Sequence, residues 1–182
     1  MKVVPKRDDA RAEPGELAHL SDLKDFMIAD PEPDIRGWKV VLRDGRKVGK
    51  VDDVLVDTSR MVVKYIEVKV DHHVLGTDED QWVLVPIGAA RLHEEHDEVV
   101  IDRLPTEGLA GAPRHARGIP TREQERELRE YYEPATRFAD AGEDGLFDAR
   151  RFWGKRRAGR ERAPYISRRA RETGASGSER GS

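Results

Sequence analysis

Apolar and polar residues alternate with a period of two between about Trp38 and Leu104, which is the pattern of half-buried β-strands. The apolar runs in this region are short, and turn sequences separate them. The pattern predicts a mainly β fold, in which five or six strands over residues 34–105 form a small antiparallel β-barrel that is only partly closed.

Several residues are predicted to shape the turns of this barrel. Asp44 and Gly45 stand between two apolar runs, and this pair is a strong hairpin signal because both positions tolerate a positive φ. Gly37 and Gly49 are interpreted as structural glycines, and Asp57 as the start of the turn into the next strand.

The strand predicted at Met61–Val70 contains one residue that does not fit a simple apolar pattern. Glu67 alternates with Ile66 and Val68, so it points to the face opposite the most apolar row, as Lys69 does. From the pattern alone, a salt-bridged residue on the outer face of the sheet is the favoured interpretation.

The segments outside the barrel show weaker patterns. Residues 1–33 are polar and are predicted to form an extended arm, within which Ser21–Ala29 has the spacing of a short helical turn or of a strand that clamps the barrel. Residues 106–149 are predicted to be a linker plus one helix, and residues 150–182 an extended basic tail that is partly disordered.

The helix of the linker region is predicted at about 122–132. Thr121 and Gln124 form a capping box at its beginning. Pro134 should end it by Glu133, because the residue before a proline avoids helical backbone angles.

Charge divides the chain into an acidic body and a basic end. Residues 150–182 hold eleven Lys or Arg and three Glu, a net +8, so the rest of the chain carries −11 within the formal total of −3. Aromatic rings mixed with guanidinium groups favour docking on a protein or membrane surface. A cut after Ala149 should therefore weaken docking without unfolding the barrel. The predicted docking residues are Phe152, Trp153, Arg156 and Arg157.

The composition disfavours several classes of function. The chain has no cysteine, and none of its serines lies in a Gly-x-Ser-x-Gly sequence, so nucleophilic catalysis lacks its usual residues. The longest apolar run, Trp82–Ala90, has nine residues, against roughly 20 needed to span a bilayer. We therefore expect a protein that is not an enzyme and that does not cross a membrane by itself.

The six histidines raise a metal-binding or proton-handling interpretation. His72 with His73, and His93 with His96, fall in predicted loops beside carboxylates, where a weak surface site could form if the two turns met. Solvated turn histidines are the favoured interpretation, and no metal site is predicted.

Two parts of the sequence resemble known proteins. Residues 34–70, DIRGWKVVLRDGRKVGKVDDVLVDTSRMVVKYIEVKV, are similar to the PRC-barrel motif, with its Asp-Gly hairpin and its closing Tyr-Ile-Glu-Val strand. The later stretches LVPIGAARLHEEHDEVVIDRL, LAGAPR and TREQERELREYY resemble, in order, the cytoplasmic domain of photosynthetic reaction-centre H subunits. Together the resemblances cover Asp34 to Tyr132.

The resemblance to H subunits implies a non-catalytic role on the cytoplasmic face of a photosynthetic membrane. Such a domain caps the L- and M-type membrane subunits, which hold bacteriochlorophyll, bacteriopheophytin and quinone, and it binds no cofactor alone. It also helps protons to reach the secondary quinone. The glutamate of the Tyr-Ile-Glu-Val strand belongs to that route, so the resemblance makes Glu67 the proton-transfer candidate.

The sequence also departs from H subunits. Those normally begin with a membrane-spanning helix, for which this sequence offers no candidate, so a separate transmembrane anchor protein and light-harvesting polypeptides are further candidate partners. The family's histidine-containing site of proton uptake precedes the barrel. Only His19 precedes Trp38 here, and no uptake residue is transferred.

Two alternatives remain open. The chain could be a stress-associated or regulatory PRC-barrel binding protein with no photosynthetic role. The other is an RNA-linked function, because ribosome-maturation factors also carry a PRC barrel. This alternative is disfavoured, since the acidic body of the chain repels phosphate. No nucleic-acid partner is therefore expected.

Overall fold

The computed structural model describes residues 16–28, 32–136, 145–153 and 166–168. Its main element is an eight-stranded sheet with the order β7-β8-β3-β4-β5-β6-β9, in which β1 pairs with β4 beside this path. The strands are β1 (Leu17–His19), β3 (Lys39–Leu42), β4 (Lys47–Asp57), β5 (Val62–Val70), β6 (Gln81–Pro86), β7 (Ala90–His93), β8 (Glu98–Ile101) and β9 (Arg114–His115).

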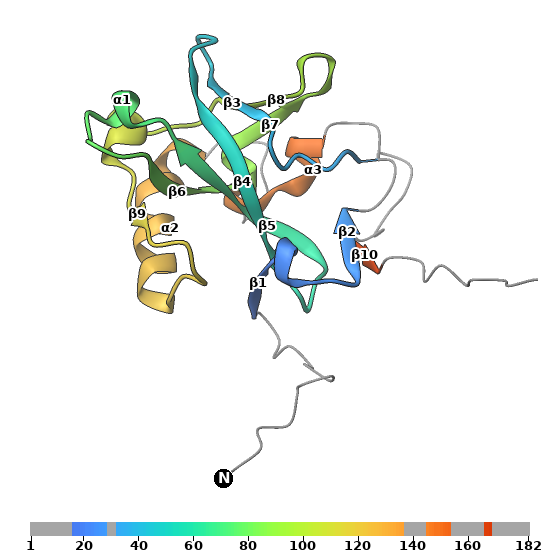
Figure 1. The fold of residues 1–182 in the computed structure, drawn as a ribbon. Coiled ribbons are helices and arrows are strands. Elements are labelled where there is room, and N and C mark those ends of the chain that lie inside the picture. Colours follow the sequence, from blue (N-terminus) through green and yellow to red (C-terminus); the bar gives the residue numbers. More distant parts are fainter. Residues whose placement is uncertain (1–15, 29–31, 137–144, 154–165, 169–182) are drawn as a thin grey trace, which may run out of the picture.

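Short elements surround this sheet. A second, two-stranded sheet pairs β2 (Phe26–Ile28) with β10 (Ile166–Arg168). The helices are α1 (His72–Leu75), α2 (Arg122–Thr136) and α3 (Ala149–Trp153), and the 3-10 turns are η1 (Leu20–Asp22), η2 (Ile87–Ala89), η3 (Glu94–His96), η4 (Gly108–Gly111) and η5 (Gly145–Phe147). Figure 1 shows the long strands β4 and β5 crossing the centre of the molecule, with α2 beside β9.

The predicted mainly β fold, with six strands inside residues 34–105 and a helix after them, is confirmed. The sheet is mixed rather than purely antiparallel, because β3 and β8 run parallel, with Val40 opposite Val99. This pairing joins the first and last strands of the 34–105 region within one sheet.

The first hairpin forms where Asp44 and Gly45 predicted it. Gly45 adopts a positive φ of 85°. Asp44 does not adopt a positive φ, and its carboxylate instead accepts a hydrogen bond of 3.0 Å from the backbone N–H of Arg46. Of the two positions that tolerate a positive φ, only Gly45 adopts one, and the predicted hairpin is confirmed.

Helix α2 begins as predicted and ends later. The capping box is present: Thr121 N–H donates to Gln124 Oε1 at 2.9 Å, and Gln124 N–H donates to Thr121 Oγ1 at 3.2 Å. The helix then runs past Pro134 to Thr136, so the predicted end by Glu133 is wrong. The Thr136 hydroxyl bonds the carbonyls of Tyr132 and Glu133 at the end of the helix, which satisfies acceptors of the last turn.

The segment before the barrel is more ordered than an extended arm. Within residues 16–28, β1 pairs antiparallel with β4, and Leu17, Leu20 and Ile28 are buried in the core. Within Ser21–Ala29, the 3-10 turn η1 covers Ser21 and Asp22, whereas the strand β2 pairs with β10 rather than with a strand of the barrel. Most of the predicted arm lies outside the described residues.

The beginning of the predicted basic tail belongs to the core. Phe152 and Trp153 on α3 are only 1% and 2% exposed, with their rings in an edge-to-face contact at 4.7 Å. Arg151, on the same helix, bonds Asp102 at 2.6 Å and the carbonyl of Ala90 at 2.9 Å. The prediction that the two aromatic residues lie on a docking surface is therefore wrong, because the barrel itself covers them. Arg156 and Arg157 lie outside the described residues.

Burial of α3 leads to a prediction about the end of the chain. Phe152→Ala should lower the free energy of unfolding by about 3–5 kcal/mol, since it removes a fully buried ring from the core. Arg150→Ala, on the exposed side of the same helix, should change it by no more than about 0.5 kcal/mol. Urea unfolding measures both. A Phe152→Ala variant as stable as the parent would show that the barrel does not need this helix, as the sequence alone predicted.

Gly49 holds β4 close to β5. A Cβ atom on this residue would lie 2.0 Å from the backbone oxygen of Lys69 and 3.0 Å from the Cα of Val70, so the two strands could not keep their separation. The structure thus gives a steric reason for the glycine that the sequence marked as structural.

We therefore expect Gly49→Ala to destabilise the fold by about 1–3 kcal/mol, since the added methyl group collides with backbone that cannot move aside cheaply. Gly118→Ala is the matched control, because nothing lies within 4 Å of the position its Cβ would take. Thermal unfolding of the two variants tests this expectation. Equal melting temperatures would contradict it.

Candidate functional site

Glu67 is a buried carboxylate at the centre of the sheet. It lies on β5 opposite Asp53 of β4 and Leu84 of β6, and it is 2% exposed. Its neighbours Ile66 and Val68 are fully buried on the other face. Glu67 does face away from the apolar row, but that face is covered, so the interpretation of Glu67 as a salt-bridged outer-face residue is wrong in placing it on an outer face.

Segments from both ends of the barrel cover this face. The ring of Tyr65 meets Phe147 of η5 edge to face at 5.3 Å, and its hydroxyl donates to Glu125 Oε1 of α2 at 3.2 Å. Lys64 bonds the same Glu125 oxygen at 2.7 Å. These contacts fix α2 and η5 against β5, next to Glu67.

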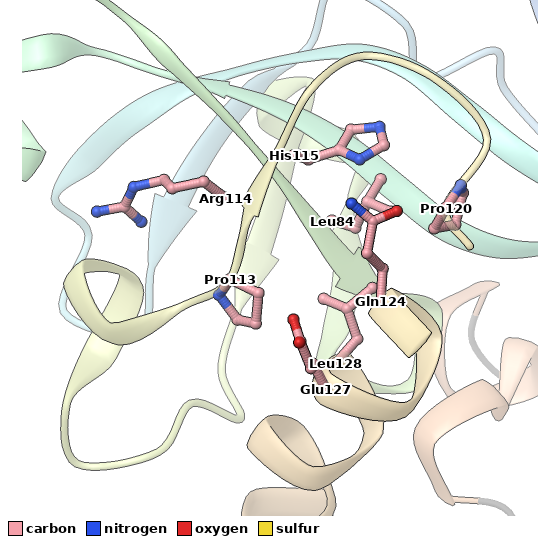
Figure 2. A pocket seen from close by; sticks show the side chains of 8 residues that line it. All are labelled: Leu84, Pro113, Arg114, His115, Pro120, Gln124, Glu127 and Leu128. Carbon is pink, nitrogen blue, oxygen red and sulfur yellow. The ribbon is translucent and has the colours of Figure 1, made fainter. Parts of the chain in front are cut away.

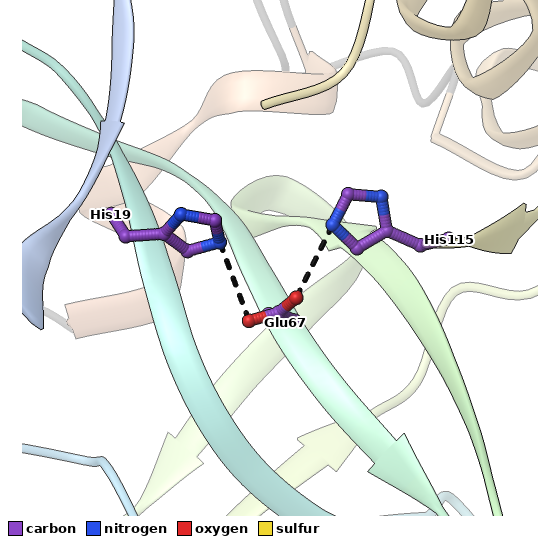
Figure 3. Close-up of side chains that lie close together, drawn as sticks. All are labelled: His19, Glu67 and His115. Atoms are coloured by element: carbon purple, nitrogen blue, oxygen red, sulfur yellow. Dashed lines mark ion pairs between the residues drawn. The ribbon is translucent and has the colours of Figure 1, made fainter. Parts of the chain in front are cut away.

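Two histidines approach the Glu67 carboxylate from opposite sides (Figure 3). His19 Nε2 lies 3.4 Å from Oε2, and His115 Nε2 lies 3.2 Å from Oε1. The His19 and His115 side chains are 13% and 6% exposed. We call these three residues, His19, Glu67 and His115, the buried cluster.

Strand pairing places each histidine. His19 ends β1 and lies opposite Leu55 of β4, one strand away from β5. His115 is on β9 opposite Trp82 of β6, on the other side of β5. Since β4 and β6 flank β5, both imidazoles can reach the covered face above Glu67.

The N-terminal segment also satisfies a second buried acid. Asp53, the register partner of Glu67 on β4, accepts hydrogen bonds from the Ser21 hydroxyl and from the backbone N–H of Val54 at 2.8 Å. Residues 16–28 thus supply one polar partner to each of two neighbouring buried carboxylates, which is what the burial of charged groups requires.

The contact between His115 and Glu67 is close without being a hydrogen bond. The two atoms are within ion-pair distance, but among the described residues neither Glu67 Oε1 nor His115 Nε2 has a hydrogen-bond partner of acceptable geometry. The short distance alone does not make a hydrogen bond, since such bonds weaken steeply when misaligned.

His115 also lines a pocket at the surface of the protein (Figure 2). It has a volume of about 120 Å³ and lies between β6, β9 and the beginning of α2. Figure 2 shows His115 at one end and the exposed Glu127 at the other. Its lining residues are Leu84, Pro113, Arg114, His115, Pro120, Gln124, Glu127 and Leu128. His115 therefore lines the pocket and contacts Glu67.

The histidines predicted in surface loops interact with other residues of the same loops. His72 begins α1, a short helix within the predicted loop, and bonds Asp80 at 3.1 Å. Hydrogen bonds from the backbone and ring of His72, and the Lys69 ammonium, lower the pKa of Asp80 to about 2. His96 lies 3.2 Å from His93 and forms with it and Glu95 an exposed group.

The predicted turn residues have structural roles. Gly37 adopts a positive φ of 84° at the start of the barrel. Asp57 is buried, and its Oδ1 accepts hydrogen bonds of 3.0 Å from the backbone N–H groups of Ser59 and Arg60. Burial pushes the pKa of Asp57 up, but these bonds outweigh it and hold the pKa below its ordinary value.

The sequence identified the carboxylate and missed its partners. Glu67 was marked by the resemblance, whereas His115 received no role and His19 was noted only as the histidine that precedes Trp38. Alternation within residues 114–115 is too short to predict a strand, and nothing local to His19 shows that it pairs with β4. Both partners are defined by pairings between distant segments.

Fold and site together define a small barrel that buries a polar cluster beneath its flanking segments. Residues 32–107 match the PRC-barrel domain. The chain therefore contains a PRC-barrel domain. Within the part of the chain that the structure describes, no helix has the length and apolarity needed to span a membrane.

The lowered pKa of Asp57 gives a pH-dependent prediction. A group whose pKa is lowered by folding adds stability above its unfolded pKa of roughly 3.9, and this stability is lost as the pH falls through the folded value. Asp57→Ala should therefore cost about 1–3 kcal/mol at neutral pH and progressively less below about pH 4. Denaturant unfolding across pH tests this, with exposed Asp78→Ala as the control. A cost independent of pH would contradict it.

Proposed function

We propose that this chain is a non-catalytic subunit of a photosynthetic reaction centre. It caps the quinone-bearing L- and M-type membrane subunits on their cytoplasmic face, stabilises the complex and assists proton delivery to the secondary quinone. The observation that carries the proposal is Glu67, which occupies the position that the resemblance to H subunits assigns to proton transfer and which lies buried between two histidines.

The surroundings of Glu67 suit proton transfer. A relay needs groups that both accept and donate protons, placed within a few ångströms of one another and reachable from solvent. Imidazole is such a group near neutral pH. The exposed Glu127, the pocket and His115 form an approach to Glu67 from one side, and His19 continues from Glu67 on the other.

The proposed partners follow from the same role. The chain would bind no cofactor alone, and bacteriochlorophyll, bacteriopheophytin and quinone would belong to the partner subunits. A separate transmembrane anchor protein and light-harvesting polypeptides would hold the peripheral chain at the membrane. Nucleic acid is not a proposed partner.

One observation favours a second candidate function. Phe152 and Trp153, which the docking hypothesis needed at the surface, are buried in the core. The aromatic residues expected to dock on a membrane complex are therefore not available for docking. The alternative is a stress-associated or regulatory PRC-barrel binding protein with no photosynthetic role.

The proposal predicts a selective kinetic effect of Glu67→Gln. The amide keeps the shape of the side chain but cannot carry a proton. Complex assembly and the first electron transfer to the secondary quinone should remain nearly unchanged, while the proton-coupled second transfer should slow by about a hundredfold or more, the range typical of a removed acid–base group. Flash-induced absorbance on purified complexes measures both steps.

Glu98→Gln is the matched control. Glu98 also lies near a histidine, with His93 Nδ1 at 3.6 Å, but its side chain is 23% exposed and far from the buried cluster in the sheet order. It should leave both transfer rates unchanged. If Glu67→Gln also leaves the second transfer at its original rate, Glu67 has no part in proton delivery. If the chain does not associate with the membrane subunits at all, the second candidate function replaces the first.

A further inference from the structure

We propose that the buried cluster is a binding site for one divalent transition-metal ion, with Zn²⁺ as the ion that its ligands fit best. The sequence alone predicted no metal site, and the proposal rests on the juxtaposition of His19, Glu67 and His115 in the fold. It does not depend on the proposed photosynthetic role.

The ligand types and their separations suit zinc. Two imidazole nitrogens and one carboxylate form a common set of three protein ligands for this ion. With bonds of about 2.0–2.1 Å, two ligand atoms of a tetrahedral site lie roughly 3.3 Å apart. His19 Nε2 lies 3.4 Å from Glu67 Oε2, and His115 Nε2 lies 3.2 Å from the other carboxylate oxygen, Oε1. With one ligand atom from each residue, all three atoms lie within 4.8 Å of one another.

The misaligned contact of His115 is the second observation. His115 Nε2 and Glu67 Oε1 are 3.2 Å apart in a buried place, yet they do not satisfy each other as hydrogen-bonding groups. A buried polar atom without a partner is costly. Coordination of one cation by both atoms would remove this cost.

The surroundings of His19 support the same assignment. Its other ring nitrogen, Nδ1, lies 3.8 Å from the Asp22 carboxylate, so a modest rotation brings it into hydrogen-bonding range. A carboxylate behind an imidazole holds the proton on Nδ1 and leaves Nε2 free to coordinate, as in many zinc sites. Asp22 is itself exposed, with a side-chain exposure of 78%, so it can move without disturbing the core.

The pocket provides room for a fourth ligand. Three protein ligands leave a position of a four-coordinate ion for water or another small ligand. His115 lines the pocket, whose volume of about 120 Å³ exceeds the roughly 30 Å³ that one water occupies in the liquid.

The exposed group His93, Glu95 and His96 offers the same residue types and serves as an internal control. It lies on a surface turn, where its ligands must lose side-chain freedom and water competes for the ion. We expect it to bind Zn²⁺ more weakly than the buried cluster.

The first experiment measures Zn²⁺ binding by the purified full chain after removal of metal with EDTA. Isothermal titration should give one tight equivalent, and the ion should raise the melting temperature. His115→Ala and Glu67→Gln should each weaken this binding at least tenfold, whereas His96→Ala should leave it unchanged. Loss of tight binding in His96→Ala alone, or the absence of tight binding in the parent chain, would overturn the proposal.

A second measurement uses the parent chain, in case a variant with a substitution in the buried cluster does not fold. Zn²⁺ should shift the imidazole NMR resonances of His19 and His115 at one equivalent, with those of His93 and His96 following only at excess ion. The reverse order would overturn the assignment. Since both experiments use the isolated chain without membrane partners, their failure leaves the proposed function standing, and an unchanged quinone rate in Glu67→Gln leaves the metal site standing.

Discussion

Burial of β5 on both faces is the constraint on which the rest of the structure depends. Ile66 and Val68 fill the barrel interior, while Tyr65 and Glu67 alternate with them on a face that is equally closed to water. A carboxylate in such a place must have polar partners, or its burial would cost several kcal/mol. The fold meets this demand from outside the barrel motif, with one histidine that precedes the motif and one that follows it.

The segments around the barrel are therefore part of the site rather than appendages. Residues 16–28 bring His19 to Glu67 and Ser21 to Asp53, while residues 114–136 bring His115 and the Glu125 contact of Tyr65. The match to the PRC-barrel domain covers residues 32–107 and so contains Glu67 but neither histidine. Both histidine partners of Glu67 thus come from segments outside the matched domain.

The parts of the fold that depend on local pattern could be predicted from the sequence, and those that depend on distant pairing could not. Alternation gave the strands, Asp44-Gly45 the hairpin, and Thr121 with Gln124 the start of α2, because each signal acts within a few residues. The burial of Phe152 could not be predicted, because the arginines around it in the sequence are typical of an exposed segment. The partners of Glu67 were hidden because a strand as short as β9 has no periodicity of its own.

Assembly from both ends of the chain has a consequence for whatever occupies the buried cluster. A proton or metal ion held jointly by His19, Glu67 and His115 binds tightly only when β1 and β9 are paired with the sheet. By mass action, occupancy stabilises this paired arrangement, and loss of either segment weakens binding. Conversely, a partner protein that displaced residues 16–28 would expose the carboxylates of Glu67 and Asp53 together, since one segment serves both. Binding of a proton or a metal ion at Glu67 would thus be coupled to the docking of the N-terminal segment.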